Sequence, residues 1–393
     1  MAEAKSLADL LRIRAANAAA IDRVNDHLGC ALGYKTSHGK ITETPAVIIF
    51  VPRKVSEALL PASQRIPKRF QGPDGLACPT DVVVGRKADD EPPSPPLDPA
   101  NQMVVDELSS GTIGIIGGIQ LGGFEPNGQG YLGTAACLVR AEDGRTGLLT
   151  NQHVGGPGGR PIYHPDPGRF RIGFTRASFE YDPDEYYFNN LIDEEDAYYR
   201  VDCAFVELSD RARPLGKPGL HRLGNIGDPL KLDLGSMGPI GRRVVSIGRT
   251  RGITRGTIMA FGYEWYDEEE SVYTDYLILG DNGQIFSDHG DSGKLIVTDD
   301  ANRNAVALLW GGWFEKLRRG HGQENWTYAI DINKALRKLE VSILTGDSAQ
   351  PDGPGFNARA RGRAVARQPH GKGLPHVRGA RSRTLRLQAA KQA

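Results

Sequence analysis

The segment SDHGDSGKLIV, residues 287–297, carries the strongest chemical signal in the sequence, because Gly-Asp-Ser-Gly stands directly before an apolar, strand-like run. Acyl transfer needs a hydroxyl held at a sharp turn, with backbone N–H groups aimed at the oxyanion that develops. Glycine permits the backbone conformation of such a turn. Ser292 is therefore the candidate nucleophile, and the N–H groups of Gly290 and Ser292 are the candidate oxyanion donors. Taken alone, the segment fits an ordinary Gly/Asp turn of a β protein equally well.

Two other segments contain residues that could assist Ser292. The run GYLGTAACLVRAEDGRTGLLTNQHV ends with His153 at the close of an apolar strand, and RVDCAFVEL places Asp202 at the head of another. Either residue by itself is more often a loop histidine or a strand-start aspartate. Together they occur in the order His, Asp, Ser, separated by 49 and 90 residues, and this order distinguishes them from other Ser-His-Asp folds. We therefore expect His153 to act as general base and Asp202 to orient it.

The elements around these residues change character along the chain. Residues 6–28 favour one amphipathic helix, and residues 30–36, 46–55 and 80–85 favour strands, which together predict a small α/β domain. Residues 88–102 contain five prolines and four acids, typical of an extended linker. The predicted organisation is an N-terminal domain at 1–87, a Pro-rich linker at 88–103, a β domain at 104–345 and a disordered tail at 346–393.

Residues 111–344 consist mostly of short strand-like runs separated by Gly, Pro, Asp and Asn. Many short strands with close turn signals predict a mainly β fold, either a sandwich or a pair of barrels. The run INKALRKLEVSI, residues 332–343, reads as a helix near the end of this domain. The Arg- and Gly-rich run at 248–257 resembles an anion-binding loop but leads into a strand, so we interpret it as a hairpin.

The C-terminal tail is strongly basic, although the formal net charge of the chain is zero. From Pro351 onward there are ten Lys or Arg residues and one acid, so the tail carries about +9 and the remainder about −9. The tail could bind nucleic acid, lie against the acidic body or simply be solvated. No aromatic residue follows Phe356, which removes base stacking and makes nucleic acid the less favoured of these partners.

Other features limit the compartment and the cofactors. We expect no membrane span and no signal peptide, hence a cytoplasmic protein. The four cysteines are widely scattered, which predicts reduced, buried thiols. The acidic run at 181–199 does not match the spacing of a calcium loop and is interpreted as a solvated insertion. We expect neither a metal nor a cofactor.

The sequence also resembles a known family over most of residues 26–343. Three segments, GTAACLVR with LLTNQHV, VDCAFVEL and HGDSGKLIV, are similar to the catalytic segments of trypsin-like peptidases of the chymotrypsin fold. The plant narrow-leaf family of trypsin-like proteins is more similar still. Its resemblance is carried by CALGYKT, PAVIIFVPRKV, GLACPTDVVV, GRTRGITRGTIMAFGYEW, YTDYLILGDN, DHGDSGKLIV and ALLWGGW. The basic tail has no counterpart.

The resemblance implies two six-stranded barrels with the site between them, His153 and Asp202 on the first and Ser292 on the second. It also implies that one strand lies beside the substrate and that Phe286 lies near the floor of the specificity pocket. The strand residues are Leu309, Trp310, Gly311 and Gly312. Glycine walls without an acid at the base would accept an apolar side chain. A core strand with a bulge is the alternative interpretation of LLWGGW.

Asp291 marks a departure from many secreted members of the trypsin-like family. In those proteins a new N-terminal ammonium pairs with the Asp that precedes the nucleophile. Here a leading domain precedes the β domain, so Asp291 needs another partner or the oxyanion hole is formed differently.

The sequence therefore predicts a serine endopeptidase that forms an acyl-enzyme intermediate with a protein or peptide substrate. The alternative is a binding or assembly protein that keeps the protease fold with little turnover. The extra leading domain motivates this alternative, because it suggests subunit contacts within a homo-oligomer.

Overall fold

The computed structural model describes residues 2–24, 27–37, 40–84, 94–182, 197–267, 270–315 and 324–346. All of them belong to the first of the two units into which the chain divides, residues 1–350. The predicted disordered tail lies outside the described residues apart from Gly346, and so does most of the acidic run at 181–199. None of the described helices has the length and apolar character that a membrane span requires.

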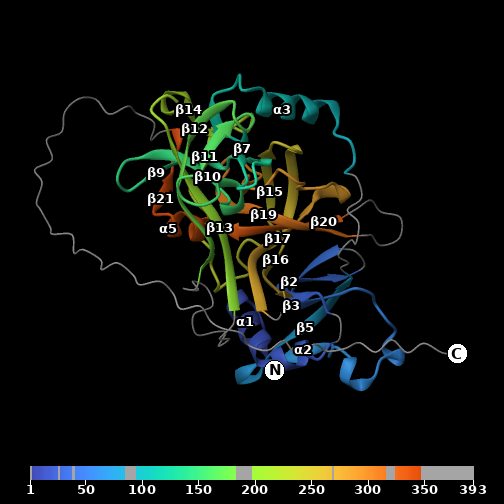
Figure 1. Cartoon of the computed structure of the whole chain (residues 1–393). Coiled ribbons are helices and arrows are strands. Elements are labelled where there is room, and N and C mark those ends of the chain that lie inside the picture. The colour runs from blue at the N-terminus through green and yellow to red at the C-terminus, as the bar shows by residue number, and fades with distance from the viewer. Residues whose placement is uncertain are drawn as a thin grey trace, which may run out of the picture. The chain divides into compact units, whose positions relative to one another are not determined.

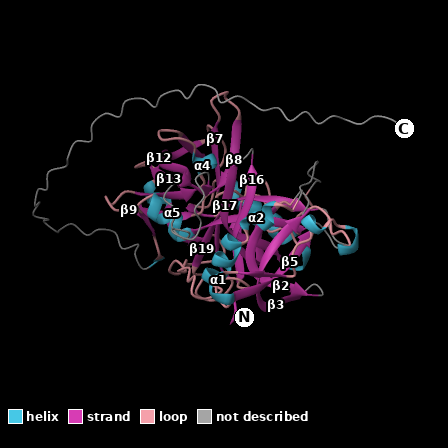
Figure 2. Cartoon of the chain, turned by 90° about the horizontal axis from the view of Figure 1, so that it is seen from below, coloured by secondary structure: helices cyan, strands magenta, loops and turns pink. Residues whose placement is uncertain are grey.

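The N-terminal part is a small sheet covered by helices. Its helices are α1 (Leu7–Ala16) and α2 (Ala18–Asp22), and its strands are β1 (Ala2–Glu3), β2 (Gly29–Ser37), β3 (Lys40–Val51), β4 (Arg69–Gln71) and β5 (Leu76–Val84). β2 pairs antiparallel with β3, and β3 pairs parallel with β5. The apolar face of α1, with Leu7, Leu10 and Leu11 fully buried, packs on this sheet. Figure 2 shows α1 and α2 close to β2, β3 and β5.

The predicted single helix over residues 6–28 is wrong in one respect, because the structure has two helices that meet at Asn17. The side chain of Asn17 donates to the carbonyl oxygens of Ile13 and Gln71, at 2.7 and 2.8 Å. Asn, unlike the alanines around it, competes in this way with the helix backbone. At the other end, Ser6 caps α1 by accepting the N–H of Asp9.

The first barrel follows α3 (Pro99–Ser110), which buries Val104 and Leu108. Its elements are β7 (Gln120–Phe124), β8 (Gly130–Thr134), β9 (Cys137–Ala141), β10 (Thr146–Thr150), α4 (Gln152–Gly155), β11 (Pro161–His164), β12 (Phe170–Asp182) and β13 (Ala197–Leu208). β9 continues β8 after two residues. Counting these two as one strand, the pairings β7–β8, β9–β10, β10–β13, β13–β12, β12–β11 and β11–β7 close a six-stranded barrel.

The second barrel closes in the same way. Its strands are β15 (Arg243–Gly248), β16 (Gly252–Asp267), β17 (Glu270–Gly280), β18 (Leu295–Thr298), β19 (Ala305–Glu315) and β20 (Glu324–Asp331). The ladder runs β15–β16–β17–β20–β19–β18 and returns to β15. The predicted hairpin at 248–257 is confirmed by the pairing of Gly248 with Gly252. The predicted pair of barrels is therefore confirmed.

Four short elements complete the described chain. They are β6 (Ile115–Gly117), β14 (Gly216–Leu220), α5 (Ile332–Lys338) and β21 (Val341–Ile343). β21 returns from the second barrel to pair with β9 of the first. Figure 1 shows α5 and β21 beside β9 and β13. The predicted helix at 332–343 is thus a shorter helix followed by a strand.

The three parts are joined by shared strands. β13 pairs parallel with β17 at residues 197–199 and links the two barrels. β16 extends beyond the second barrel and pairs with β2 through Ala260, Phe261 and Glu264. One apolar cluster accordingly contains Leu10, Leu32 and Phe261 together. The N-terminal part and the second barrel therefore share a core.

The predicted linker at 88–103 is shorter than expected. Residues 88–93 lie outside the described residues, but Pro99 already begins α3. Proline at the first helical position costs no hydrogen bond, and Asp98 caps the helix by accepting the N–H of Asn101. The proline that suggested an extended chain is therefore a helix start.

Arg14 links α1 to β16, so its substitution tests whether the contact between the N-terminal part and the second barrel stabilises the chain. Its side chain is 3% exposed and donates to the carbonyl oxygen of Gly262 at 2.7 Å, with Glu264 at 3.9 Å. We expect Arg14→Leu to lower the free energy of unfolding by about 3 kcal/mol, because the buried carboxylate loses its cation. Arg12→Leu on the same helix, where Arg12 is 41% exposed and pairs with Asp9, should cost less than about 1 kcal/mol. Urea unfolding of both variants measures the difference, and equal losses would contradict the anchoring role.

Candidate active site

His153 lies in α4, the single helical turn that follows β10. Its Nδ1 atom lies 2.7 Å from Oδ2 of Asp202, and its backbone N–H donates to Oδ1 of the same carboxylate at 3.2 Å. The imidazole is 42% exposed, whereas the carboxylate is completely buried. A buried carboxylate on Nδ1 fixes the ring's orientation and leaves Nε2 for a reacting group.

Asp202 does not stand at the head of its strand, as the sequence suggested, but in the middle of β13. The strand extends upstream because residues 197–199 pair with β17. The register of β12 and β13 shifts between Phe179 and Tyr181, so β13 carries one extra residue there, and Asp202 has a φ of 23°. Bulges commonly re-aim a side chain beside a functional site. At this bulge the carboxylate of Asp202 is buried beside His153.

Two residues that sequence reasoning missed contact Asp202. The side chain of Asn151 donates to the carbonyl oxygen of Asp202 at 2.8 Å. The guanidinium of Arg200 has Nη2 3.8 Å from Oδ2 of Asp202 and lies 4.4 Å from the ring centre of Trp310. Arg200 thus connects the buried carboxylate to the strand that was predicted to lie beside the substrate.

Ser292 lies at the end of the loop that precedes β18, and glycine places this loop against the first barrel. A Cβ atom on Gly293 would stand 2.3 Å from both the carbonyl oxygen of Thr134 and Oγ1 of Thr150, so the contact requires glycine. The N–H of Thr134 donates to the carbonyl oxygen of Ser292 at 2.9 Å. Ser292 is thereby held next to the segment that leads into His153. Within the described residues Ser292 makes no hydrogen bond to His153, a bond that often tightens only with substrate bound.

Residues 288–291 form a tight turn just before Ser292. The N–H of Asp291 donates to the carbonyl oxygen of Asp288 at 2.9 Å, and Gly290 has a φ of 89°. His289, at the second position, is not among the residues with positive φ. A positive φ at the third position alone is that of a type II turn, which favours glycine there. The carbonyl oxygen of Gly290 accepts from Oγ1 of Thr134 at 2.8 Å. The glycine predicted as an oxyanion donor therefore occupies a defined backbone conformation.

Lys294 is the charged partner of Asp291, which the sequence did not identify. Both side chains are completely buried, with Nζ of Lys294 3.4 Å from Oδ2 of Asp291. Burial lowers the pKa of Lys294 below its ordinary value, and the charge of Asp291 opposes this. The available signal was a lysine at the start of the otherwise apolar run KLIVT.

The residues predicted to meet the substrate fall into two groups. The side chains of Phe286 and Leu309 are buried in the core of the second barrel, 0% and 2% exposed. Trp310 and Gly311 are half-buried, and Gly312 is exposed. The ladder between β19 and β20 has a bulge at Trp310. The interpretation as a bulged core strand therefore describes Leu309 and Trp310, whereas a position of this strand beside the substrate stays a prediction.

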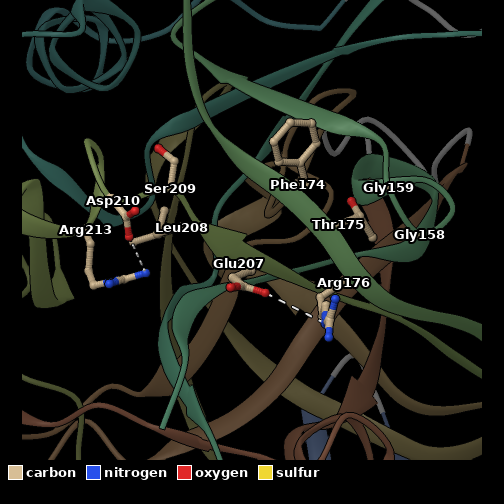
Figure 3. Close-up of a pocket in the computed structure, with 10 residues that line it drawn as sticks. All are labelled: Gly158, Gly159, Phe174, Thr175, Arg176, Glu207, Leu208, Ser209, Asp210 and Arg213. Atoms are coloured by element: carbon tan, nitrogen blue, oxygen red, sulfur yellow. Dashed lines mark ion pairs between the residues drawn. The ribbon is translucent and has the colours of Figure 1, made fainter. Parts of the chain in front are cut away.

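A cavity of about 480 Å³ lies elsewhere on the first barrel. It is lined by residues of β12, by the end of β13 and by the loop after α4 (Figure 3). Glu207 and Arg176 form an ion pair at its edge, 3.8 Å apart. None of the residues predicted for the site lines it.

The four cysteines, Cys30, Cys78, Cys137 and Cys203, are all buried free thiols. Burial raises the pKa of Cys137 to about 12. The predicted burial of the four cysteines is confirmed, and the barrels are held by core packing.

Two protein families match the chain. The NARROW LEAF 1 N-terminal domain matches residues 2–83, and the Nal1 C-terminal domain matches residues 100–348. Protein NARROW LEAF 1 of Oryza sativa subsp. japonica is 33% identical over 375 residues, which cover 88% of this chain and 62% of the rice protein. A probable serine protease of Bradyrhizobium tropiciagri is 27% identical over 343 residues, which cover 77% of this chain and 40% of that protein. The chain spans less than two thirds of either relative.

Similar solved structures include bacterial proteases. Thermobifida fusca Protease A is 20% identical and Nocardiopsis Protease 19% identical, each with a TM-score of 0.39. The first match covers 59% of this chain and 99% of the solved one, and the second covers 58% and 98%. The match to the Nal1 C-terminal domain includes both barrels and the segments around His153, Asp202 and Ser292. The chain therefore belongs to the NARROW LEAF 1 family.

Proposed function

We propose that this chain is a serine endopeptidase that uses Ser292, His153 and Asp202. The observation that carries the proposal is the 2.7 Å contact between the imidazole of His153 and the buried carboxylate of Asp202, beside the glycine-bounded turn of Ser292. The relative from Bradyrhizobium tropiciagri, a probable serine protease, supports the same class of reaction.

The reaction follows from these positions. Oγ of Ser292 attacks the carbonyl carbon of a peptide bond while Nε2 of His153 accepts the hydroxyl proton. The oxyanion is stabilised by the N–H groups of Gly290 and Ser292. His153 then protonates the departing amine as the C–N bond breaks, and water hydrolyses the resulting acyl ester by the same route in reverse. Asp202 stabilises the imidazolium throughout.

The substrate is a protein or peptide with an apolar side chain before the cleaved bond. The exposure of Trp310, Gly311 and Gly312 supports this proposal, because a strand that lies beside a substrate must be accessible to it. We further propose a cytoplasmic setting, a reducing compartment in which the four cysteines would remain thiols.

Ser292→Ala is the direct test of the nucleophile. We expect it to abolish labelling by a fluorophosphonate probe and to lower peptide turnover by about 10⁴- to 10⁶-fold, because no other hydroxyl can form the acyl ester. Ser342→Ala, which changes an exposed serine on β21, should label like the unchanged chain. Failure of the unchanged chain to label, with its fold intact, would instead favour the binding or assembly protein.

Asp202→Asn tests the orienting carboxylate. The neutral amide cannot stabilise the imidazolium, so we expect kcat at neutral pH to fall by about 10⁴-fold. The matched control is Asp182→Asn on β12, whose side chain is 7% exposed and lies 2.7 Å from Lys338. This control should lose thermal stability yet keep its turnover. Similar losses of kcat in the two variants would refute the role of Asp202.

A further inference from the structure

Lys294 is a completely buried lysine two residues after Ser292. Its ammonium donates to the carbonyl oxygen of Phe286 at 2.7 Å, to Oγ1 of Thr254 at 3.1 Å and to Oδ2 of Asp291 at 3.4 Å. A lysine ammonium has three donors, so all of them are used. A buried charge is tolerated only with such pairing. The three acceptors therefore form a site that holds the ammonium of Lys294.

Two of the three acceptors of Lys294 lie at the ends of one loop, and the third, Thr254, lies on β16. Phe286 precedes the turn at residues 288–291, and Asp291 ends it. Oδ2 of Asp291 also accepts the N–H of Asp288 at 3.2 Å, and Oδ1 accepts the N–H of Thr250 at 2.9 Å. The ammonium and the carboxylate together therefore close the loop and fasten it to the hairpin between β15 and β16.

The conformation of this turn decides where the N–H of Gly290 points. Type I and type II turns differ by reversal of their central peptide, here the bond between His289 and Gly290. The φ of 89° at Gly290 belongs to type II. The carbonyl oxygen of this peptide, which is that of His289, accepts from Oγ1 of Thr250 at 2.6 Å. Asp291 in turn holds Thr250 by accepting its N–H at 2.9 Å. Loss of the contacts of Asp291 would therefore loosen the hydrogen bond that opposes the reversal.

The segment that precedes α3 lies beside this turn. Oγ of Ser94 hydrogen-bonds the carboxylate of Asp288, and Arg251 donates to the carbonyl oxygen of Pro95 at 2.8 Å. The turn and the contacts of Lys294 are therefore formed in the intact chain.

We propose that Lys294 is a positioning residue that holds the 288–291 turn in its type II form, and so keeps the oxyanion donors in place in the uncleaved chain. The assignment rests on the proposed endopeptidase function. Lys294 does not touch the substrate, and it acts through Asp291 and the backbone of Gly290.

Lys294→Met is the test variant, and Lys334→Met is its matched control. Lys334 on α5 is also buried against a carboxylate, at 2.9 Å from Asp275, with both side chains at most 3% exposed. Melting temperature, kcat and KM on a peptide substrate, and affinity for a peptidyl aldehyde are measured for both. The aldehyde forms a hemiacetal with Ser292, and its oxygen then reports on the oxyanion donors.

We expect both variants to melt at lower temperature, but only Lys294→Met to lose about 10²- to 10³-fold in kcat. Its KM should change little, and its affinity for the aldehyde should fall by a similar factor. Loss of kcat no greater than in Lys334→Met would overturn the assignment while leaving the proposed function standing. An unchanged chain with neither labelling nor turnover would overturn both.

A measurement on the unchanged chain covers the case in which Lys294→Met does not fold. After fluorophosphonate labelling, intact mass should show the label on the full-length chain. Label found only on a chain shortened to a new N-terminus before residue 104 would overturn the assignment.

Discussion

The geometry of the candidate site depends on the contact between His153 and the buried carboxylate of Asp202. A carboxylate without exposure to water must find its donors within the chain. Asp202 finds them in the backbone N–H and the ring of His153, with Arg200 nearby. The bulge in β13 and the short helix after β10 are the local deviations that bring these groups together.

The second barrel also contains a buried carboxylate, but different groups donate hydrogen bonds to it. Asp291 is as deeply buried as Asp202, but its donors are two backbone amides of the β15–β16 turn, the amide of Asp288 and the ammonium of Lys294. Phe286, which binds that ammonium through its carbonyl oxygen, belongs to the apolar cluster that also contains Leu7 and Leu10 of α1. The loop that ends at Ser292 is therefore packed against the apolar core that the N-terminal part shares with the second barrel.

Local patterns predicted the features that depend on local sequence. Short apolar runs between turn residues predicted a mainly β domain, and the resemblance to trypsin-like peptidases implied that it forms two barrels. His153, Asp202 and Ser292 were selected because each stands next to such a run. The chemical roles of these three residues remain a prediction. The bulge at Asp202 was missed because it depends on pairing between β12 and β13. The role of Lys294 was missed for two reasons. Its acceptor Thr254 lies 40 residues away in the sequence, and Phe286 accepts through a backbone carbonyl, which no residue type signals. The break at Asn17 depends on a carbonyl oxygen of Gln71.

The pairing of β2 with β16 also covers a sheet edge. A strand at an exposed edge offers unpaired N–H and C=O groups to other chains and favours aggregation. Because β2 pairs with β16 at Ala260–Glu264, the barrels without the N-terminal part would expose this edge to other chains. The N-terminal part therefore protects the second barrel from edge-to-edge association.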